Sequence, residues 1–151
     1  MQARKATTDD AKLILKLYDL RREPLMRKAR DFVNGFFPQS ADEFLKIMQA
    51  WGSDQNAYLR QVFSYWDMAA SLVLRGALHE ELFIDSAGEM LFNFSKIHPF
   101  LAEIREGMSA PEFLRNIETL VTRSKEGRAK LKAIQERVRV IVQMRQQAAK
   151  G

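Results

Sequence analysis

The sequence predicts an all-α fold, a single helical-bundle-like domain of about five or six helices with a long C-terminal helix. Apolar residues recur at spacings of three and four along most of the chain, and no segment alternates as a strand would. Turn-forming residues and helix-capping motifs separate these segments. A length of 151 residues is that of one domain with a sizeable core.

The N-terminal segment is expected to be helical, with Thr8 or Asp9 as its capping residue. Proline cannot donate a backbone hydrogen bond and clashes with the preceding turn, so Pro24 predicts a kink or two stacked helices. The sequence Gly35 to Pro38 ends the segment. One continuous face is expected along it, made of Ala11, Leu15, Tyr18, Arg22, Leu25, Ala29, Phe32 and Phe36.

Three Ser-x-x-Glu motifs predict helix starts, because the serine oxygen and the glutamate can each bind a free amide of the first turn. They are Ser40 with Glu43, Ser86 with Glu89, and Ser109 with Glu112. The second motif opens a segment, 87–108, in which Pro99 predicts a further kink.

The helix at about 54–75 is expected to be the centre of the domain. Ser53 or Asp54 can cap its start, and Gly76 is its natural C-terminal residue. Its apolar residues wrap nearly all the way round, which is typical of a helix covered on most sides.

The polar residues of this helix fall on one narrow stripe, at steps of four, three, four and four: Arg60, Ser64, Asp67, Ser71 and Arg75. One interpretation is a solvent-facing edge, with Asp67 exposed or paired to a nearby arginine. The other is a polar pocket for a small molecule or a reaction, in which a partly buried acid has a perturbed pKa.

The polar cluster after this helix contains no recognisable catalytic or metal motif. His79, Glu80 and Glu81 are expected at a helix start, where the dipole favours anions. The run "HEELF" lacks the second histidine of a zinc-protease motif, since position 83 is Phe. We therefore assign no catalytic residue, no metal ligand and no cofactor.

The C-terminal part is expected to be one more helix. We divide the chain into a helical domain at 1–122 and a basic extension at 123–151, which is either continuous with the preceding helix or broken near Gly127. The extension carries a heptad-like seam suited to pairing with a second copy or to docking on its own chain: Leu131, Ile134, Val138 and Ile141.

Charge is distributed unevenly. Residues 1–37 have a net charge of +4, residues 38–122 of −6, and residues 123–151 of +7. The basic ends can lie against the acidic middle of the same or a neighbouring chain. The extension can also attract nucleic acid, although it lacks the aromatic residues that would favour single strands.

These features favour a non-enzymatic interaction protein that forms a homo-oligomer, most simply a dimer, or binds another protein. Two alternatives stay open: a small-molecule-binding or catalytic domain centred on Asp67, and an accessory nucleic-acid-binding protein. The chain has no cysteine, no apolar run long enough for a membrane span and no visible secretory signal. A cytoplasmic location is therefore expected.

The runs "NAYLRQVFSYWDMAASLVLRGALHEELF", "GEMLFNFSKIHPFLAEIRE" and "PEFLRNIETLV" resemble a family of short bacterial all-helical proteins of unknown function. The resemblance covers about residues 12–121 and leaves the basic extension outside. It implies a helical domain from a bacterial cytoplasm, and it transfers no catalytic residue.

Overall fold

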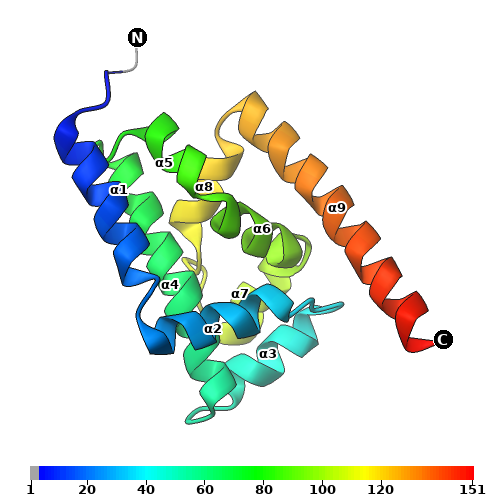
Figure 1. Ribbon diagram of the computed structural model, residues 1–151. Coiled ribbons are helices and arrows are strands. Elements are labelled where there is room, and N and C mark those ends of the chain that lie inside the picture. The colour runs from blue at the N-terminus through cyan, green and yellow to red at the C-terminus, as the bar shows by residue number, and fades with distance from the viewer. Residues whose placement is uncertain (1–3) are drawn as a thin grey trace.

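The computed structural model describes residues 4–151, and helices make up most of this part of the chain (Figure 1). The all-α class is confirmed, but the helices are more numerous than the expected five or six because the segment 77–122 is divided into short ones. Their bounds are α1 Thr8–Leu20, α2 Pro24–Gly35, α3 Ala41–Gln49, α4 Asp54–Leu74, α5 Glu80–Ser86, α6 Gly88–Ile97, the 3-10 helix η1 His98–Phe100, α7 Leu101–Met108, α8 Arg115–Thr122 and α9 Lys125–Ala149.

The long α4 lies at the centre of the fold. It packs against α2, α3 and α8, while α6 and α7 complete the core. Ser53 caps its start, as expected, and Gly76 follows its end with a left-handed φ of +80°. The buried residues of α4 lie on several sides of the helix: Asn56, Leu59, Val62, Phe63, Trp66, Ala69, Ala70 and Val73.

None of the three expected capping boxes forms completely. Ser86 is the last residue of α5, and α6 starts without a side-chain cap because Glu89 points to partners on other helices. Ser109 ends α7 in a left-handed conformation, and the next helix starts only at Arg115. Ser40 does cap α3, but the Glu43 carboxylate accepts from the amide of Gln39 instead of closing the box.

The expected continuous face of residues 11–36 is wrong in its first half. Pro24 starts a new helix instead of bending one, so the phase of the apolar pattern is not carried across the turn. Thr7, one residue before the expected position, caps α1. Helix α1 faces the domain with Asp10, Leu17 and Arg21, whereas Leu15, Tyr18 and Leu25 are exposed to solvent.

Helix α9 lies along the outside of the domain, where it contacts α6 and α8 (Figure 1). It is not continuous with α8: the chain breaks at Arg123 and Ser124, and the Ser124 hydroxyl accepts from the amide of Gly127. The break therefore comes just before Gly127.

Gly127 fits the turn between α8 and α9 because it has no side chain. A Cβ atom there would overlap the carbonyl oxygen of Val121, a backbone atom that cannot turn away as a side chain would. We expect Gly127→Ala to lower the free energy of unfolding by about 1–3 kcal/mol, as measured by chemical denaturation.

Gly88→Ala is the matched control, since Gly88 also lies in the first turn of a helix and an added Cβ would meet nothing within 4 Å. This control should leave stability unchanged or raise it slightly. Equal effects of the two substitutions would show that the turn tolerates a side chain.

Candidate functional site

Asp67, the acid of the predicted polar stripe, caps a neighbouring helix. Its Oδ1 accepts from the amide of Ile117 at 3.0 Å, and its Oδ2 accepts from Nδ2 of Asn116 at 2.9 Å. Helix α8 starts from Leu114, which provides no side-chain cap. A helix start is usually capped by the residue that precedes it. Here the half-buried carboxylate of Asp67, on α4, caps the start of α8 instead.

The other members of the stripe also bind nearby groups. Arg60 donates from Nε to Asn56 at 3.0 Å and stacks on the ring of Trp51, and Arg75 is exposed at the end of α4. Ser64 and Ser71 donate to carbonyl oxygens of their own helix, and Ser64 is exposed. None of these five residues lines any of the four main hollows of the described surface. Ligand binding at this stripe stays a prediction.

The predicted seam of the C-terminal extension faces the protein's own domain. Leu131 is buried and Ile134 packs against the core, while Val138 and Ile141 are half-buried. Docking within the chain was one of the two expected arrangements. Of the basic residues of α9, only Arg139 makes an ion pair in the described part of the chain, and its partner is Glu136 of the same helix. Nucleic-acid binding by this helix stays a prediction.

Glu89, which sequence reasoning treated as a capping residue, is the centre of a polar network in the core. Its carboxylate accepts from Arg30, at 2.8 Å from Nη2, and from Nε1 of Trp66 at 3.1 Å. Asn34 donates to it at 3.3 Å and in turn accepts from Asn93. Burial alone would raise the pKa of Glu89, but the bonds and charge of Arg30 outweigh it and place the pKa below its usual value.

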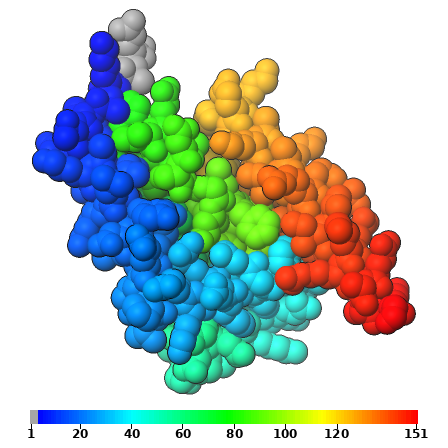
Figure 2. All heavy atoms as spheres, viewed as in Figure 1, coloured from blue at the N-terminus to red at the C-terminus, as the bar shows by residue number. Residues whose placement is uncertain are grey.

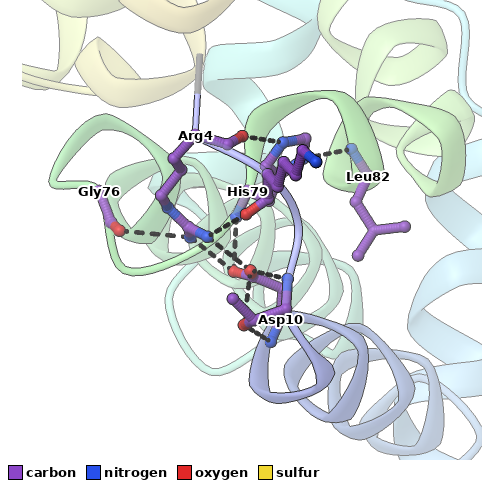
Figure 3. A network of polar contacts seen from close by, with 7 residues as sticks. Arg4, Asp10, Gly76, His79 and Leu82 are labelled. Atoms are coloured by element: carbon purple, nitrogen blue, oxygen red, sulfur yellow. Dashed lines mark hydrogen bonds and ion pairs between the residues drawn. The ribbon is translucent and has the colours of Figure 1, made fainter. Parts of the chain in front are cut away.

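A second network joins the N-terminal segment to the start of α5 (Figure 3). Arg4 forms two bonds of 2.6 Å to the carboxylate of Asp10, which also accepts from Thr7 and from the amide of His79. The Arg4 bond, aided by the Thr7 and His79 bonds, holds the pKa of Asp10 well below its usual range, against the effect of burial.

Both ring nitrogens of His79 have partners in this network. Nδ1 accepts from the amide of Leu82 at 3.2 Å, which confirms the expected helix start, and Nε2 lies 2.8 Å from the carbonyl oxygen of Arg4. The imidazole is therefore held in place as a structural cap, and it also lines a surface hollow beside α5.

Hollows surround the short helix α5, and Ile84 lines three of them. They have volumes of about 860, 850 and 190 Å³, and the second lies between α6 and α9, where Figure 2 shows a depressed surface. Each has at least one acid at its edge: Glu80, Glu81, Asp85, Glu89 or Glu126.

A fourth hollow, of about 380 Å³, lies between α9 and the turn from α6 into η1. Lys96 lines it, with only 5% of the residue exposed. The Lys96 ammonium donates to the carbonyl oxygens of Val33 and Phe36 at 2.6 and 2.7 Å, at the C-terminal end of α2. Burial, with added repulsion from Arg145, lowers the pKa of Lys96 to about 7.

The described residues contain no cluster of three or more histidine or acidic side chains that could hold a metal ion. In residues 4–151, no helix combines the length and the apolar character that crossing a bilayer requires. The arrangement is that of an all-helical domain whose polar residues mostly cap and connect helices.

A family model matches most of the chain. The model of the domain of unknown function DUF4760 matches residues 6–124, and the chain belongs to this family. The match ends at Ser124, so α9 lies outside the family domain. No curated protein and no solved structure matches the chain. Bacterial origin and a cytoplasmic location stay predictions.

Asp67→Ala should lower the free energy of unfolding by about 1–3 kcal/mol, because the start of α8 loses its cap and Asn116 loses its acceptor. Asp67→Asn keeps one acceptor oxygen and should cost less. Ser64→Ala on the same helix is the control, and denaturant titration provides the measurement. A neutral Asp67→Ala would show that water replaces the carboxylate at no cost.

The lowered pKa of Lys96 predicts a pH-dependent stability. The unfolded chain holds the Lys96 proton up to a pKa near 10.5, whereas the folded chain loses it near 7. The unfolded state thus binds more protons between these values, and the free energy of unfolding should rise with pH there, by on the order of a few kcal/mol.

Lys96→Met should remove this rise, and Lys12→Met, at an exposed position of α1, should keep it. Urea titrations from about pH 6.5 to pH 9.5 would measure it. This range stops short of the region near pH 12 to which burial raises the pKa of Tyr65. A flat profile for the unsubstituted protein would contradict the assignment.

Proposed function

We propose that this protein is a non-enzymatic interaction protein that self-associates through the outer face of α1 and the start of α2. One observation carries the proposal. Among residues 4–151, five of the nine large apolar residues that are exposed lie between residues 13 and 25: Leu13, Leu15, Tyr18, Leu20 and Leu25. When a helix has apolar residues on a side that its own chain leaves uncovered, that side usually packs against another protein.

The uncovered residues are substantially exposed. Leu15, 68% exposed, lies on the side of α1 opposite the buried Leu17, and Leu25, 60% exposed, lies at the start of α2. Leu13 and Leu20 lie nearer to Leu17 and are less exposed, at 37% and 44%. Tyr65 donates to the carbonyl oxygen of Leu17 at 2.5 Å, and the Arg4–Asp10 network fixes the start of the helix. Helix α1 is thus held in place at both ends while its outer face is open.

A second copy of the chain is the partner that fits this face. A two-fold axis sets the same patch against itself, so an apolar patch meets an apolar patch. The flanks carry both signs of charge: Lys16 and Asp19 are exposed and make no ion pair in the described part of the chain. Repulsion between the two net-positive copies is screened beyond about 8 Å at physiological salt.

The energetics favour a weak dimer. Covering these side chains on two copies would contribute on the order of 10 kcal/mol, and association consumes about 4–15 kcal/mol. A dissociation constant in the micromolar range or above is therefore expected, as for a transient interaction.

Light scattering on the purified protein from about 10 to about 500 μM should show a mass that rises from monomer to dimer. Leu15→Lys with Leu25→Lys should keep the mass at that of a monomer throughout, with an unchanged circular dichroism spectrum. Both positions are exposed, so the fold should not depend on them.

The matched control is Val140→Lys with Met144→Lys, which changes two exposed apolar residues of α9 to the same residue. This pair should still form dimers. If it abolishes the dimer and the α1 pair does not, α9 is the interface. A monomeric unsubstituted protein at every concentration would sink the proposal.

A further inference from the structure

The hollow beside Lys96 differs from the other three in its charge. Its lining includes two cations, Lys96 and Arg139, and no acid, whereas each of the other hollows has at least one acid at its edge. The remaining polar lining is rich in side chains that can donate hydrogen bonds: Gln39, Ser95, Gln135, Gln143 and Gln146.

The Lys96 ammonium is buried without a carboxylate partner. Among the described residues it makes no ion pair, and its acceptors are backbone carbonyl oxygens at the end of α2. Two of these bonds are short, but the third, to Asn34, is 3.5 Å long. The rings of Phe37 and Phe92 flank the ammonium, at 4.6 and 5.0 Å from Nζ to the ring centroids. An anion in the hollow would therefore act on this charge through electrostatic attraction.

The surroundings of Lys96 add positive charge. Arg145 of α9 donates to the carbonyl oxygen of Gly35, and both it and Lys96 lie against the ring of Phe37. Arg139 is exposed and pairs only with Glu136, an exposed ion pair of small energy that a ligand can replace. A buried cation with cations nearby is stabilised by any anion that reaches it.

The rest of the hollow is apolar. Its walls also contain Pro38, Pro99, Phe100, Val138 and Val142, and its volume of about 380 Å³ is that of a site for a small molecule. A ligand that fits would carry an anionic group at one end and a short carbon body at the other.

We propose that this hollow is a binding site for a small organic anion, whose carboxylate or phosphate group contacts Arg139 and is attracted by the buried charge of Lys96, while its carbon body lies on Pro99 and Phe100. The site is separate from the self-association face on α1 and does not depend on it.

Two properties result from the position of the site. Since α9 forms one wall, a bound anion contacts both α9 and the family domain, and it should strengthen their attachment. Since an anion favours the charged form of Lys96, binding should take up protons and weaken as pH rises above about 7. The other charged groups around Lys96 are Arg139, Glu136 and Arg145 of α9 and Glu89 of α6; His98, at the α6–η1 turn, bonds to Gln135.

Isothermal calorimetry with phenyl phosphate, benzoate, inorganic phosphate and uncharged benzyl alcohol would test the proposal. We expect saturable binding of at least one aromatic anion, weaker binding of inorganic phosphate, and none of benzyl alcohol. Tighter binding of phenyl phosphate or of benzoate identifies the preferred anionic group. Affinity should be at least tenfold higher at pH 6.5 than at pH 9.

Gln143→Glu places a carboxylate in the wall and should reduce affinity at least tenfold, as should Arg139→Gln. Both positions are exposed, so neither variant should disturb the fold. Lys132→Gln, which removes a charge from α9 outside the hollow, is the control and should bind normally.

The proposal fails if no anion binds below about 10 mM, if benzyl alcohol binds as well as benzoate, or if Lys132→Gln weakens binding as much as Arg139→Gln does. The last result would mean that the net positive charge of α9 attracts anions without a site. The same measurements on the Leu15→Lys, Leu25→Lys variant should give the same affinities, which separates this site from the dimer.

Discussion

Helix ends lower the stability of an all-helical protein unless their backbone groups are bonded, because each end leaves amides or carbonyls without partners inside the helix. In this fold the central helix supplies many of those partners. Asn56 donates to the carbonyl oxygens of Ile47 and Met48 at the end of α3, and Asp67 accepts from the start of α8. Tyr65 donates to a carbonyl near the end of α1. The neighbouring helices must therefore pack against α4 in positions where its polar side chains also reach their ends.

This constraint explains why α4 carries polar residues at all. A helix covered on several sides gains most from apolar residues, and each polar group must find a partner or lower stability. Trp66 illustrates the solution: its ring is buried in the core while its Nε1 donates to Glu89 of α6. The sequence suggests a ligand site for a lone acid such as Asp67. The structure shows that its carboxylate instead accepts hydrogen bonds within the protein, at the start of α8.

The sequence was sufficient to predict features set by local chemistry. The all-helical class and the bounds of α4 follow from apolar spacing, from the Ser53 cap and from a glycine that can adopt the left-handed conformation after Arg75. The helical character of α9 and its apolar stripe with Leu131 and Ile134 follow in the same way, although the sequence did not decide between the same chain and a second copy as the partner. Each of these depends on residues within a few turns of one another.

Features that depend on distant residues could not be predicted. Glu89 satisfies the pattern of a capping box, but Arg30 and Trp66, both more than twenty residues away, offer it a half-buried ion pair and a hydrogen bond that a surface cap cannot match. The direction of α1 was misjudged for a related reason. Its apolar residues lie on more than one side, and only tertiary contacts through Asp10 and Arg21 decide which side faces inward.

The attachment of α9, a helix outside the family domain, depends on few buried contacts. Of its 25 residues only Leu131 is fully buried, and a buried leucine contributes about 1.5–3 kcal/mol. Half-buried contacts and the bond from Arg145 to Gly35 add to this, whereas Arg145 and Lys96 repel each other at the same end of α2. The free energy that favours docking of α9 on the domain is therefore expected to be small. An element held so weakly responds strongly to any group that bridges it to the domain, because even about 1.4 kcal/mol of extra attachment changes the docked-to-undocked ratio about tenfold. The cations that line the hollow, Lys96 and Arg139, make an anion the natural bridging group. The proposed anion would lie between α9 and the domain, so its binding would favour the docked position of the helix.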